Sequence, residues 1–344
     1  MGPTGEHRIL QVHPTRRCNL RCLHCYSMSS PEERDALDED LVGGAVEDAS
    51  REGFTLVGVS GGEPLMYRPL RAVLETAQAC GMFTTVTTNG MLLTASNLAR
   101  LDSVTDLIAI SLDGMPESHN RMRNSDRAFA TMSSRLDNVR ASGIPFGFIF
   151  TLTRYNVHEL EWVASFAVAQ GARLLQIHPL EEVGRARRQL RGGRPDETEL
   201  GWALLETLRI QAEYSDRIIV HVDATTRLAI ERSPQDVFAS PMDPEAPLAE
   251  LVSPLVLEQD GWVVPLQYGF PRAFALGNLK TERLATMAKR WRAEHLASYQ
   301  EVCRATFDTL SQGASGSIFN WYEAVMFQGQ ASTLAGTRRV PAGD

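Results

Sequence analysis

The sequence lacks long apolar runs, an apolar N-terminus and an excess of positive charge. No stretch of about eighteen consecutive apolar residues occurs, which excludes a membrane-spanning helix. Residues 1–7 are polar and contain no signal-peptide core, so we expect a cytoplasmic protein with a short flexible N-terminus. Acidic residues outnumber basic ones by 42 to 34, and the net charge of −8 argues against nucleic acid as a general partner.

Lysine and paired cysteines are also scarce. Only Lys280 and Lys289 are lysines, a bias toward arginine that we attribute to base composition rather than to function. Five cysteines among 344 residues are too few for a disulfide framework. The remaining composition, 43% hydrophobic and 22% charged, is typical of a globular protein, and the length predicts one barrel-sized domain with a smaller one.

Three of the cysteines lie within eight residues of one another: Cys18, Cys22 and Cys25. The other two, Cys80 and Cys303, stand alone. A zinc site usually has four ligands in two separated pairs, and no second pair follows here. Three soft thiolates favour an iron–sulfur cluster with one iron left open for a ligand. From the residues alone, the alternatives are a zinc site completed by His24 and plain buried cysteines.

Strand-like apolar runs alternate with helix-like segments over the first half of the chain. The predicted strands are 9–12, 55–59, 83–87, 107–112, 146–152 and 174–178. The predicted helices are 39–51, 70–80, 95–101, 128–141 and 159–170. Asp38 and Thr94 are suitable N-cap residues for two of these helices. The alternation predicts an α/β fold of parallel βα units, arranged as an open sheet or a barrel.

The alternation ends after Pro179, and the rest of the chain is predicted to form a connector and a smaller α+β domain. The connector, 184–247, is expected to hold a helix at 196–214, a strand near 217–222 and an irregular loop at 233–247. Apolar runs at 251–257 and 262–266 flank an Asp-Gly pair, which is typical of a hairpin turn. The C-terminal domain, 248–334, is expected to include a helix at 282–299 and to be followed by a loose tail at 335–344.

At its cysteines the chain resembles the radical S-adenosylmethionine (radical SAM) enzymes. Cysteines with this spacing, in a loop after the first strand, are similar to the signature of that superfamily, and the likeness extends over six βα units. The resemblance implies a partial (βα)6 TIM-like barrel over 8–183, with one [4Fe-4S] cluster held by Cys18, Cys22 and Cys25. It also implies S-adenosylmethionine as a cofactor, whose reductive cleavage gives a 5′-deoxyadenosyl radical that abstracts hydrogen from a substrate.

Two further segments resemble cofactor-binding loops of this superfamily. Gly61, Gly62, Glu63 and Pro64 follow the second strand and are similar to a loop that contacts the methionyl ammonium group. Two glycines allow close approach of the backbone to a ligand, and Glu63 or the backbone carbonyls can accept from an ammonium. Asn89, after the third strand, resembles a residue placed near the cofactor. Without the resemblance, both segments also fit ordinary turns.

Residues after the fourth and sixth strands complete the expected cofactor site. The resemblance implies that Ser111 or Asp113 binds the ribose hydroxyls and that Arg123 meets the methionyl carboxylate. An acid and an arginine suit those two groups chemically. His178 either faces the bound nucleoside or is a core histidine. The carboxyl ends of parallel strands, where these residues lie, are where α/β barrels bind ligands.

The C-terminal domain resembles a SPASM or twitch extension without its metal ligands. The segments that carry this likeness are 184–186, 260–266 and 276–279. Leu266 stands where such extensions place a cysteine, and Cys303 is the only cysteine after Cys80. One thiol cannot hold a cluster, so we expect a single cluster in the chain and a metal-free domain that closes the barrel over the substrate.

These features predict an enzyme but do not identify its substrate. A ribosomal peptide and a small natural product, such as a sugar, amino acid or nucleoside, are both compatible with the sequence. The SPASM likeness favours a peptide, whereas residues 1–7 leave no room for a leader-binding domain. The expected reductant is an electron donor such as flavodoxin or ferredoxin. The alternative of another class is a non-catalytic iron–sulfur module for electron transfer or sensing.

Overall fold

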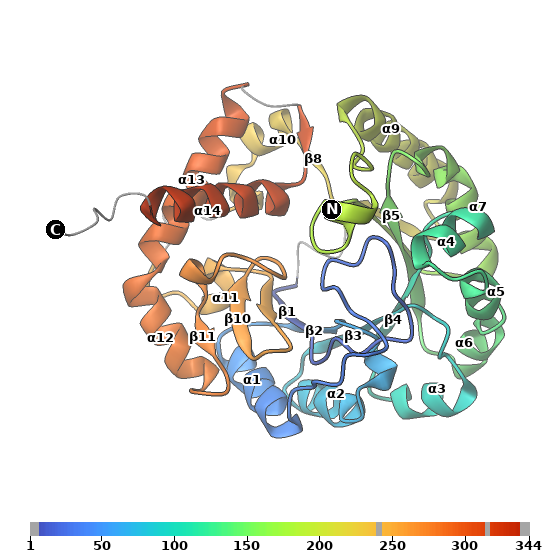
Figure 1. Ribbon diagram of the computed structural model, residues 1–344, viewed down its shortest axis with the longest axis horizontal. Helices are drawn as coiled ribbons and strands as arrows, with labels where there is room; N and C mark the ends of the chain where they lie inside the picture. The colour runs from blue at the N-terminus through green and yellow to red at the C-terminus, as the bar shows by residue number, and fades with distance from the viewer. Residues whose placement is uncertain (1–6, 239–242, 314–316, 338–344) are drawn as a thin grey trace.

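In the part of the chain that the computed structural model describes, residues 7–238, 243–313 and 317–337, ten strands form one curved sheet (Figure 1). In chain order the strands are β1 (Ile9–Val12), β2 (Leu56–Val59), β3 (Phe83–Thr88), β4 (Leu107–Ser111), β5 (Phe146–Leu152), β6 (Leu174–Pro179), β7 (Ile219–Val222), β9 (Leu255–Leu257), β10 (Trp262–Pro265) and β11 (Gly277–Asn278). Along the sheet, β1 to β7 are neighbours in sequence order and pair in parallel.

Helices cover the outer face of the parallel strands (Figure 1). They are α1 (Glu39–Arg51), α2 (Leu70–Ala79), α3 (Ala95–Leu101), α4 (Pro116–Arg123), α5 (Ala128–Ser133), α6 (Leu136–Ser142) and α7 (Leu160–Gln170). On β5, Phe146, Phe148 and Phe150 are buried, and the ring of Phe148 lies 5.8 Å from that of Phe166 on α7. Ile149 and Thr151, on either side of Phe150, point the other way, as alternate residues of a strand do. The predicted α/β barrel is thus confirmed.

One predicted helix of the barrel was wrong in detail, and another helix was not predicted. The segment 128–141 is two helices, α5 and α6, separated at Ser134 and Arg135, rather than one. Helix α4 was not predicted, because its polar sequence carries no apolar periodicity. It begins with Pro116 in its first turn and ends at Asn124, which adopts the left-handed conformation (φ 52°).

The connector adds a seventh parallel strand. Strand β7, predicted near 217–222, pairs with β6 in parallel, so the barrel sheet is one strand longer than the six expected. Helix α9 (Glu197–Tyr214) precedes it and begins at a capping box formed by Asp196 and Glu199. The predicted helix at 196–214 is therefore confirmed.

The C-terminal strands continue the barrel sheet instead of forming a separate one. β9 pairs in parallel with β1, and β10 and β11 follow in antiparallel fashion. The predicted hairpin around Asp260 and Gly261 is present as the β9–β10 pair. By pairing with β1, β9 satisfies the backbone groups that would otherwise form an open sheet edge. Local sequence patterns cannot predict this pairing, since 245 positions separate Leu10 from its partner Leu255.

The elements not yet named include the C-terminal helices, which gather beside β9, β10 and β11 (Figure 1). These remaining elements are α8 (Ala186–Gln189), α10 (Arg227–Arg232), α11 (Leu248–Leu251), α12 (Leu284–Glu294), α13 (Leu296–Ser311), α14 (Trp321–Thr337), the paired strands β8 (Thr225–Thr226) and β12 (Ile318–Phe319), and the 3-10 turns η2 (Pro64–Met66), η3 (Val157–Glu159), η4 (Pro234–Asp236) and η5 (Arg272–Phe274). The single helix predicted at 282–299 was wrong: α12 ends at Glu294, and α13 begins after a turn at His295.

The two predicted chain ends fall mostly outside the described residues. Of the N-terminal stretch 1–7, only His7 is described. α14 extends through Thr337, three residues into the expected loose tail, and 338–344 lie outside the described part. Among the helices that are described, none is long and apolar enough to cross a membrane.

Candidate functional site

The three predicted cysteine ligands lie in one loop, which joins β1 to α1. Cys18 and Cys22 are buried, Cys25 is partly exposed, and all three pack in one small cluster with Met91. Burial, and then the charge of Glu63, raises the pKa of Cys18 to about 12. Burial also raises the pKa of Cys22. Such thiols are neutral at pH 7 unless a metal takes the place of their protons, because a coordinating thiol is deprotonated.

The loop does not converge on one point. Within the described residues, no three His, Cys, Asp or Glu side chains are arranged to hold a single metal ion. A zinc ion needs its ligand atoms at about 2.0–2.3 Å from one centre, whereas thiolates bound to different irons of a cluster lie further apart. Nε2 of His24, the fourth ligand of the zinc alternative, lies 3.9 Å from Oδ2 of Asp113. The choice of an iron–sulfur cluster over a zinc site stays a prediction from the cysteine spacing.

The two glycines after β2 hold the cysteine loop in place. The N–H of Gly62 donates to the Thr15 carbonyl (2.8 Å), and the N–H of Glu63 donates to the Arg17 carbonyl (2.9 Å). A Cβ on Gly61 would lie 2.7 Å from the Thr15 oxygen, and a Cβ on Gly62 would lie 2.2 Å from the Arg17 oxygen. The glycines thus allow a close approach whose partner here is the backbone that leads into the cysteines. Their role toward a methionyl ammonium stays a prediction.

The carboxylate of Glu63 joins the loops that follow β2 and β3. It is fully buried and accepts from Thr88 Oγ1 (2.8 Å) and from the N–H of Asn89 (3.0 Å). It also caps η2, which begins at Pro64. Burial raises the pKa of Glu63. Asn89 in turn donates from Nδ2 to Asn19 Oδ1 (2.7 Å), so Glu63 positions Asn89 against the cysteine loop.

Asp113 and Arg123, expected to meet different groups of the cofactor, form a buried ion pair with each other. Nε of Arg123 lies 2.7 Å from Oδ2 of Asp113, and Nη1 of Arg123 lies 3.8 Å from Sγ of Cys22. Burial raises the pKa of a carboxyl group, but the charge of Arg123 outweighs this, so the pKa of Asp113 is lowered.

One oxygen of this carboxylate is left over. Among the described residues, neither oxygen of the fully buried Asp113 makes a well-aligned hydrogen bond. Oδ2 still has its close ion-pair contact with Nε of Arg123, whereas Oδ1 has no partner among these residues. A buried ionised oxygen without a donor is costly and is satisfied when a ligand hydroxyl donates to it. Ser111, the other candidate for the ribose, ends β4 two residues earlier and is also buried. The orphaned oxygen fits the expected nucleoside.

Three buried residues that the sequence analysis missed fix the segment carrying Asp113. Its N–H donates to Nδ1 of His119 (3.1 Å), and its carbonyl accepts from Nδ2 of Asn156 (3.0 Å). Glu159 accepts from the N–H of Met115 (2.6 Å). Burial lowers the pKa of His119 to about 3, which keeps its Nδ1 free to accept. Asn156 and Glu159 follow the carboxyl end of β5, and that position was the signal available in the sequence.

Residues of the connector, which follows β6, form hydrogen bonds with the cysteine loop. The guanidinium of Arg185 donates to the Cys22 carbonyl (2.7 Å) and to the Ser29 carbonyl (2.8 Å). Its backbone N–H donates to the Cys25 carbonyl (3.0 Å). A Cβ on Gly184, whose φ is +55°, would lie 2.2 Å from a carbonyl oxygen of the same loop. Residues first noted for their SPASM likeness thus fasten the loop that carries the thiols.

His178 belongs to a charged cluster at the carboxyl ends of β6 and β7. Its Nδ1 lies 2.7 Å from Oδ2 of Asp223, and its Nε2 lies 3.6 Å from Oε1 of Glu181. Burial lowers the pKa of an imidazole, but the hydrogen bond and charge of Asp223 outweigh it and raise the pKa of His178 to about 9. The side chain is 40% exposed, so His178 is not a core histidine. That it faces a nucleoside stays a prediction.

The C-terminal region reaches the cysteine loop through aromatic rings. The ring of Tyr268, which follows β10, lies 5.5 Å from that of Tyr26 and 5.1 Å from that of His13. Nε2 of Gln267 lies 3.4 Å from a carboxylate oxygen of Glu181. The segment expected to close the barrel therefore contacts the loop that carries the thiols.

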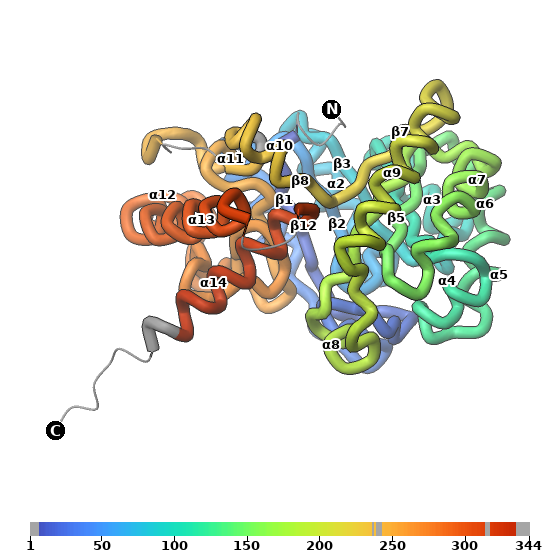
Figure 2. Tube along the Cα trace, turned by 90° about the horizontal axis from the view of Figure 1, so that it is seen from above, coloured from blue at the N-terminus to red at the C-terminus, as the bar shows by residue number. Residues whose placement is uncertain are grey.

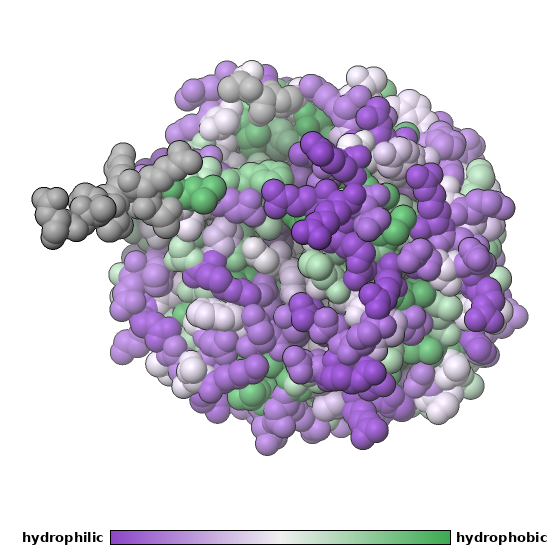
Figure 3. Space-filling model, viewed as in Figure 1, coloured by the Kyte–Doolittle hydropathy of each residue, from purple (hydrophilic) through white to green (hydrophobic). Residues whose placement is uncertain are grey.

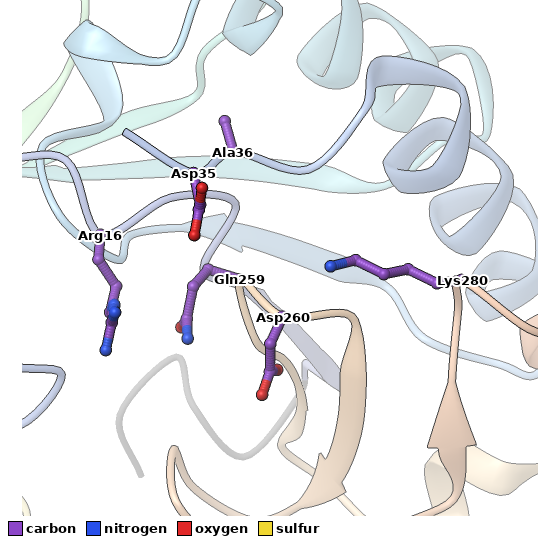
Figure 4. A pocket seen from close by; sticks show the side chains of 6 residues that line it. All are labelled: Arg16, Asp35, Ala36, Gln259, Asp260 and Lys280. Carbon is purple, nitrogen blue, oxygen red and sulfur yellow. The ribbon is translucent and has the colours of Figure 1, made fainter. Parts of the chain in front are cut away.

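A polar pocket lies where the cysteine loop meets the β9–β10 turn (Figure 4). It is lined by Arg16, Asp35, Ala36, Gln259, Asp260 and Lys280. Small-molecule sites are mostly apolar with a few placed polar groups, and this lining is almost entirely charged or polar. The pocket is therefore a surface feature beside the cysteine loop rather than the site of the expected chemistry.

Comparison with known proteins agrees with this geometry. Residues 12–167 match the family model described as the Radical SAM superfamily. The Fe-coproporphyrin III synthase of Methanosarcina barkeri is 32% identical over 148 residues, which cover 42% of this chain and 37% of that protein. The PqqA peptide cyclase of Ruegeria pomeroyi is 29% identical over 230 residues, 65% of this chain and 58% of that protein. The chain thus spans less than two thirds of either relative.

A solved structure extends the likeness over nearly the whole chain. Native anSMEcpe with bound AdoMet and Cp18Cys peptide matches with a TM-score of 0.64 and 16% identity, over 96% of this chain and 98% of that one. At this identity the match shows a shared fold, which includes the C-terminal region. The SPASM-like character of that region stays a prediction.

Proposed function

We propose that this chain, whose residues 12–167 match the Radical SAM superfamily model, is a radical SAM enzyme that holds one [4Fe-4S] cluster on Cys18, Cys22 and Cys25 and binds S-adenosylmethionine beside it. When bound, these cofactors supply the reductive cleavage that yields methionine and a 5′-deoxyadenosyl radical able to take hydrogen from a substrate. The residues of the chain bind and orient the cofactors, hold the thiols and keep water out.

This proposal rests on one observation: the cysteine loop contacts an ion pair whose buried carboxylate, within the described residues, lacks a hydrogen-bond donor to one oxygen. Arg123 contacts Sγ of Cys22 and pairs with Asp113, whose second oxygen has no donor among the described residues. In this proposal a ribose hydroxyl donates to that oxygen, and the remaining N–H groups of Arg123 donate to the methionyl carboxylate. The two ends of one S-adenosylmethionine molecule are then held within reach of the thiols.

Of the two acceptors considered for the methionyl ammonium, Glu63 and the backbone carbonyls, we favour the carbonyls. Both oxygens of Glu63 already accept hydrogen bonds from the chain. We therefore assign the ammonium to backbone carbonyls of the Gly61–Gly62 turn, with Glu63 as the residue that positions the turn and Asn89. His178, which is partly exposed at the carboxyl end of β6 and pairs with Asp223, is our candidate for binding the nucleoside or the substrate.

A peptide is the substrate class that we favour. One relative is named a PqqA peptide cyclase, and anSMEcpe was solved with a peptide over almost the full length shared with this chain. The second candidate is a small molecule, supported by the 32% identity to Fe-coproporphyrin III synthase over a shorter stretch. Both assignments place the substrate between the barrel and the C-terminal region.

The test is the formation of 5′-deoxyadenosine by the reconstituted protein with dithionite and S-adenosylmethionine. We expect methionine and 5′-deoxyadenosine in equal amounts from the wild type and neither from Cys22→Ala. Absence of both from an iron-loaded wild type would favour the non-catalytic electron-transfer or sensing module. Faster formation with a peptide encoded beside the gene supports the peptide assignment, and faster formation with a tetrapyrrole precursor of Fe-coproporphyrin III supports the second candidate.

A further inference from the structure

Four exposed arginines without a carboxylate partner lie around the cysteine loop: Arg17, Arg187, Arg188 and Arg191. In the described part of the chain, none of them has an acidic oxygen within 4.0 Å. By contrast Arg16 and Arg21, on the same loop, pair with Glu33 and Glu32 and are locally neutralised. Although the chain has a net charge of −8, these four arginines place positive charge beside the cysteine loop.

The arginines share one surface because their segments are joined. Arg17 forms a β-bridge with Ser30, next to Ser29, whose carbonyl accepts from Arg185. Arg185 directly precedes α8, which carries Arg187 and Arg188. Figure 2 shows α8 against the dark blue segment after β1, and Figure 3 shows strongly hydrophilic side chains gathered over the same part of the face.

An apolar centre accompanies this charge. Met28 is 54% exposed on the cysteine loop and adopts a left-handed backbone conformation (φ 57°), while the loop's Leu23 packs against Ala186 and Leu190 on the other side. Methionine and arginine are both enriched in protein-binding surfaces. We call the set of Arg17, Arg187, Arg188, Arg191 and Met28 the arginine surface.

Hydrogen bonds join the segment before α8 to the backbone of the cysteine loop. Arg185 contacts the carbonyls of Cys22 and Cys25 directly, and α8 begins one residue later. A partner seated on α8 and Met28 is thus closer to the thiols than one seated on the outer helices of the barrel. That position suits electron delivery to the cluster.

We propose that the arginine surface is the docking site of an acidic one-electron donor protein, a flavodoxin-type or ferredoxin-type carrier. The proposal rests on the function proposed above, since it needs a cluster to reduce. In the docked complex the reduced carrier gives one electron and is oxidised by one electron, the oxidised cluster gains that electron, and no bond is formed or broken. Opposite charges accelerate such an encounter by 10–1,000-fold, an effect that salt suppresses.

The test is the rate at which a photoreduced flavodoxin of net negative charge reduces the cluster, followed by stopped flow. In the triple variant Arg187→Glu/Arg188→Glu/Arg191→Glu we expect a rate constant at least tenfold lower at about 0.05 M salt, with the difference shrinking toward about 1 M salt, where screening acts over about 3 Å. The triple Arg→Gln variant at the same positions should fall between, because it removes charge without reversing it.

A matched control changes the same net charge elsewhere. Arg173→Glu/Arg232→Glu/Arg304→Glu alters three exposed arginines before β6, on α10 and on α13. An equal fall in rate for this control, or an unchanged rate in the first triple variant, overturns the docking site. Dithionite-driven formation of 5′-deoxyadenosine and iron content should match the wild type in every variant. Loss of dithionite activity in the wild type itself would instead contradict the proposed function and leave the docking rates as a separate measurement.

Discussion

Removing the guanidinium of Arg185 tests how the cysteine loop is held. Arg185→Ala deletes two charge-assisted hydrogen bonds, at 2.7 Å to Cys22 and 2.8 Å to Ser29. A hydrogen bond from a charged group is worth about 1.5–3 kcal/mol, but water can replace this partly exposed one. We therefore take about 1 kcal/mol for each, or about 2 kcal/mol in total, which makes opening of the loop about 30-fold more frequent.

Two measurements report this opening. Amide hydrogen exchange in residues 18–30 of the apo protein should become about 30-fold faster, since exchange follows the local opening equilibrium. The reconstituted variant should also lose iron faster to a chelator. Arg185→Lys should be intermediate, because a lysine reaches one carbonyl where the planar guanidinium reaches two. Arg187→Ala, two residues away and without a partner, is the control. Equal exchange and equal iron retention in Arg185→Ala would refute the reasoning.

Three further predictions use the same preparations. Cys18→Ala, Cys22→Ala and Cys25→Ala should each abolish the brown chromophore, whereas Cys80→Ala, at the end of α2, should not; a coloured, active Cys22→Ala contradicts the ligand assignment. Asp113→Ala and Arg123→Ala should each weaken S-adenosylmethionine binding, measured by equilibrium dialysis, by tenfold or more, while the iron content stays full. Unchanged affinity in both variants would show that the ribose and carboxylate contacts are wrongly assigned. Because the folded-state pKa of His178 is raised to about 9, its contribution to stability is complete below its unfolded pKa near 6.5 and is lost as the pH rises through about 9. Urea unfolding should therefore show a loss of stability between these values that is smaller in Asp223→Asn, and equal losses would contradict the pair.

Local sequence patterns predicted the barrel strands well because each is a short apolar run. Strand β5 agrees with its predicted bounds, and the spacing of Cys18, Cys22 and Cys25 identified the loop that packs the thiols together. The edge pairing of β9 with β1 could not be predicted, because it depends on residues far apart in sequence and not on any local period. For the same reason the turn at His295, which divides two helices, was missed.

The candidate site was predicted as separate contacts, whereas the structure has a connected network. Asp113 and Arg123 were each assigned to a ligand group, but they also pair with each other. Glu63 was considered as a ligand acceptor, and its buried carboxylate instead accepts from the chain. The residue type determines which groups a side chain can bind, but the fold determines which of those groups lies within reach.

The central claim is that the cysteine loop carries one cluster with an iron open to S-adenosylmethionine. Electron paramagnetic resonance of the dithionite-reduced protein, with and without S-adenosylmethionine, tests it most directly. The account predicts one cluster signal, about four irons per chain, and a change in the signal when S-adenosylmethionine is added. A signal that S-adenosylmethionine leaves unchanged, or a second cluster signal that survives replacement of Cys18, Cys22 and Cys25, would contradict it.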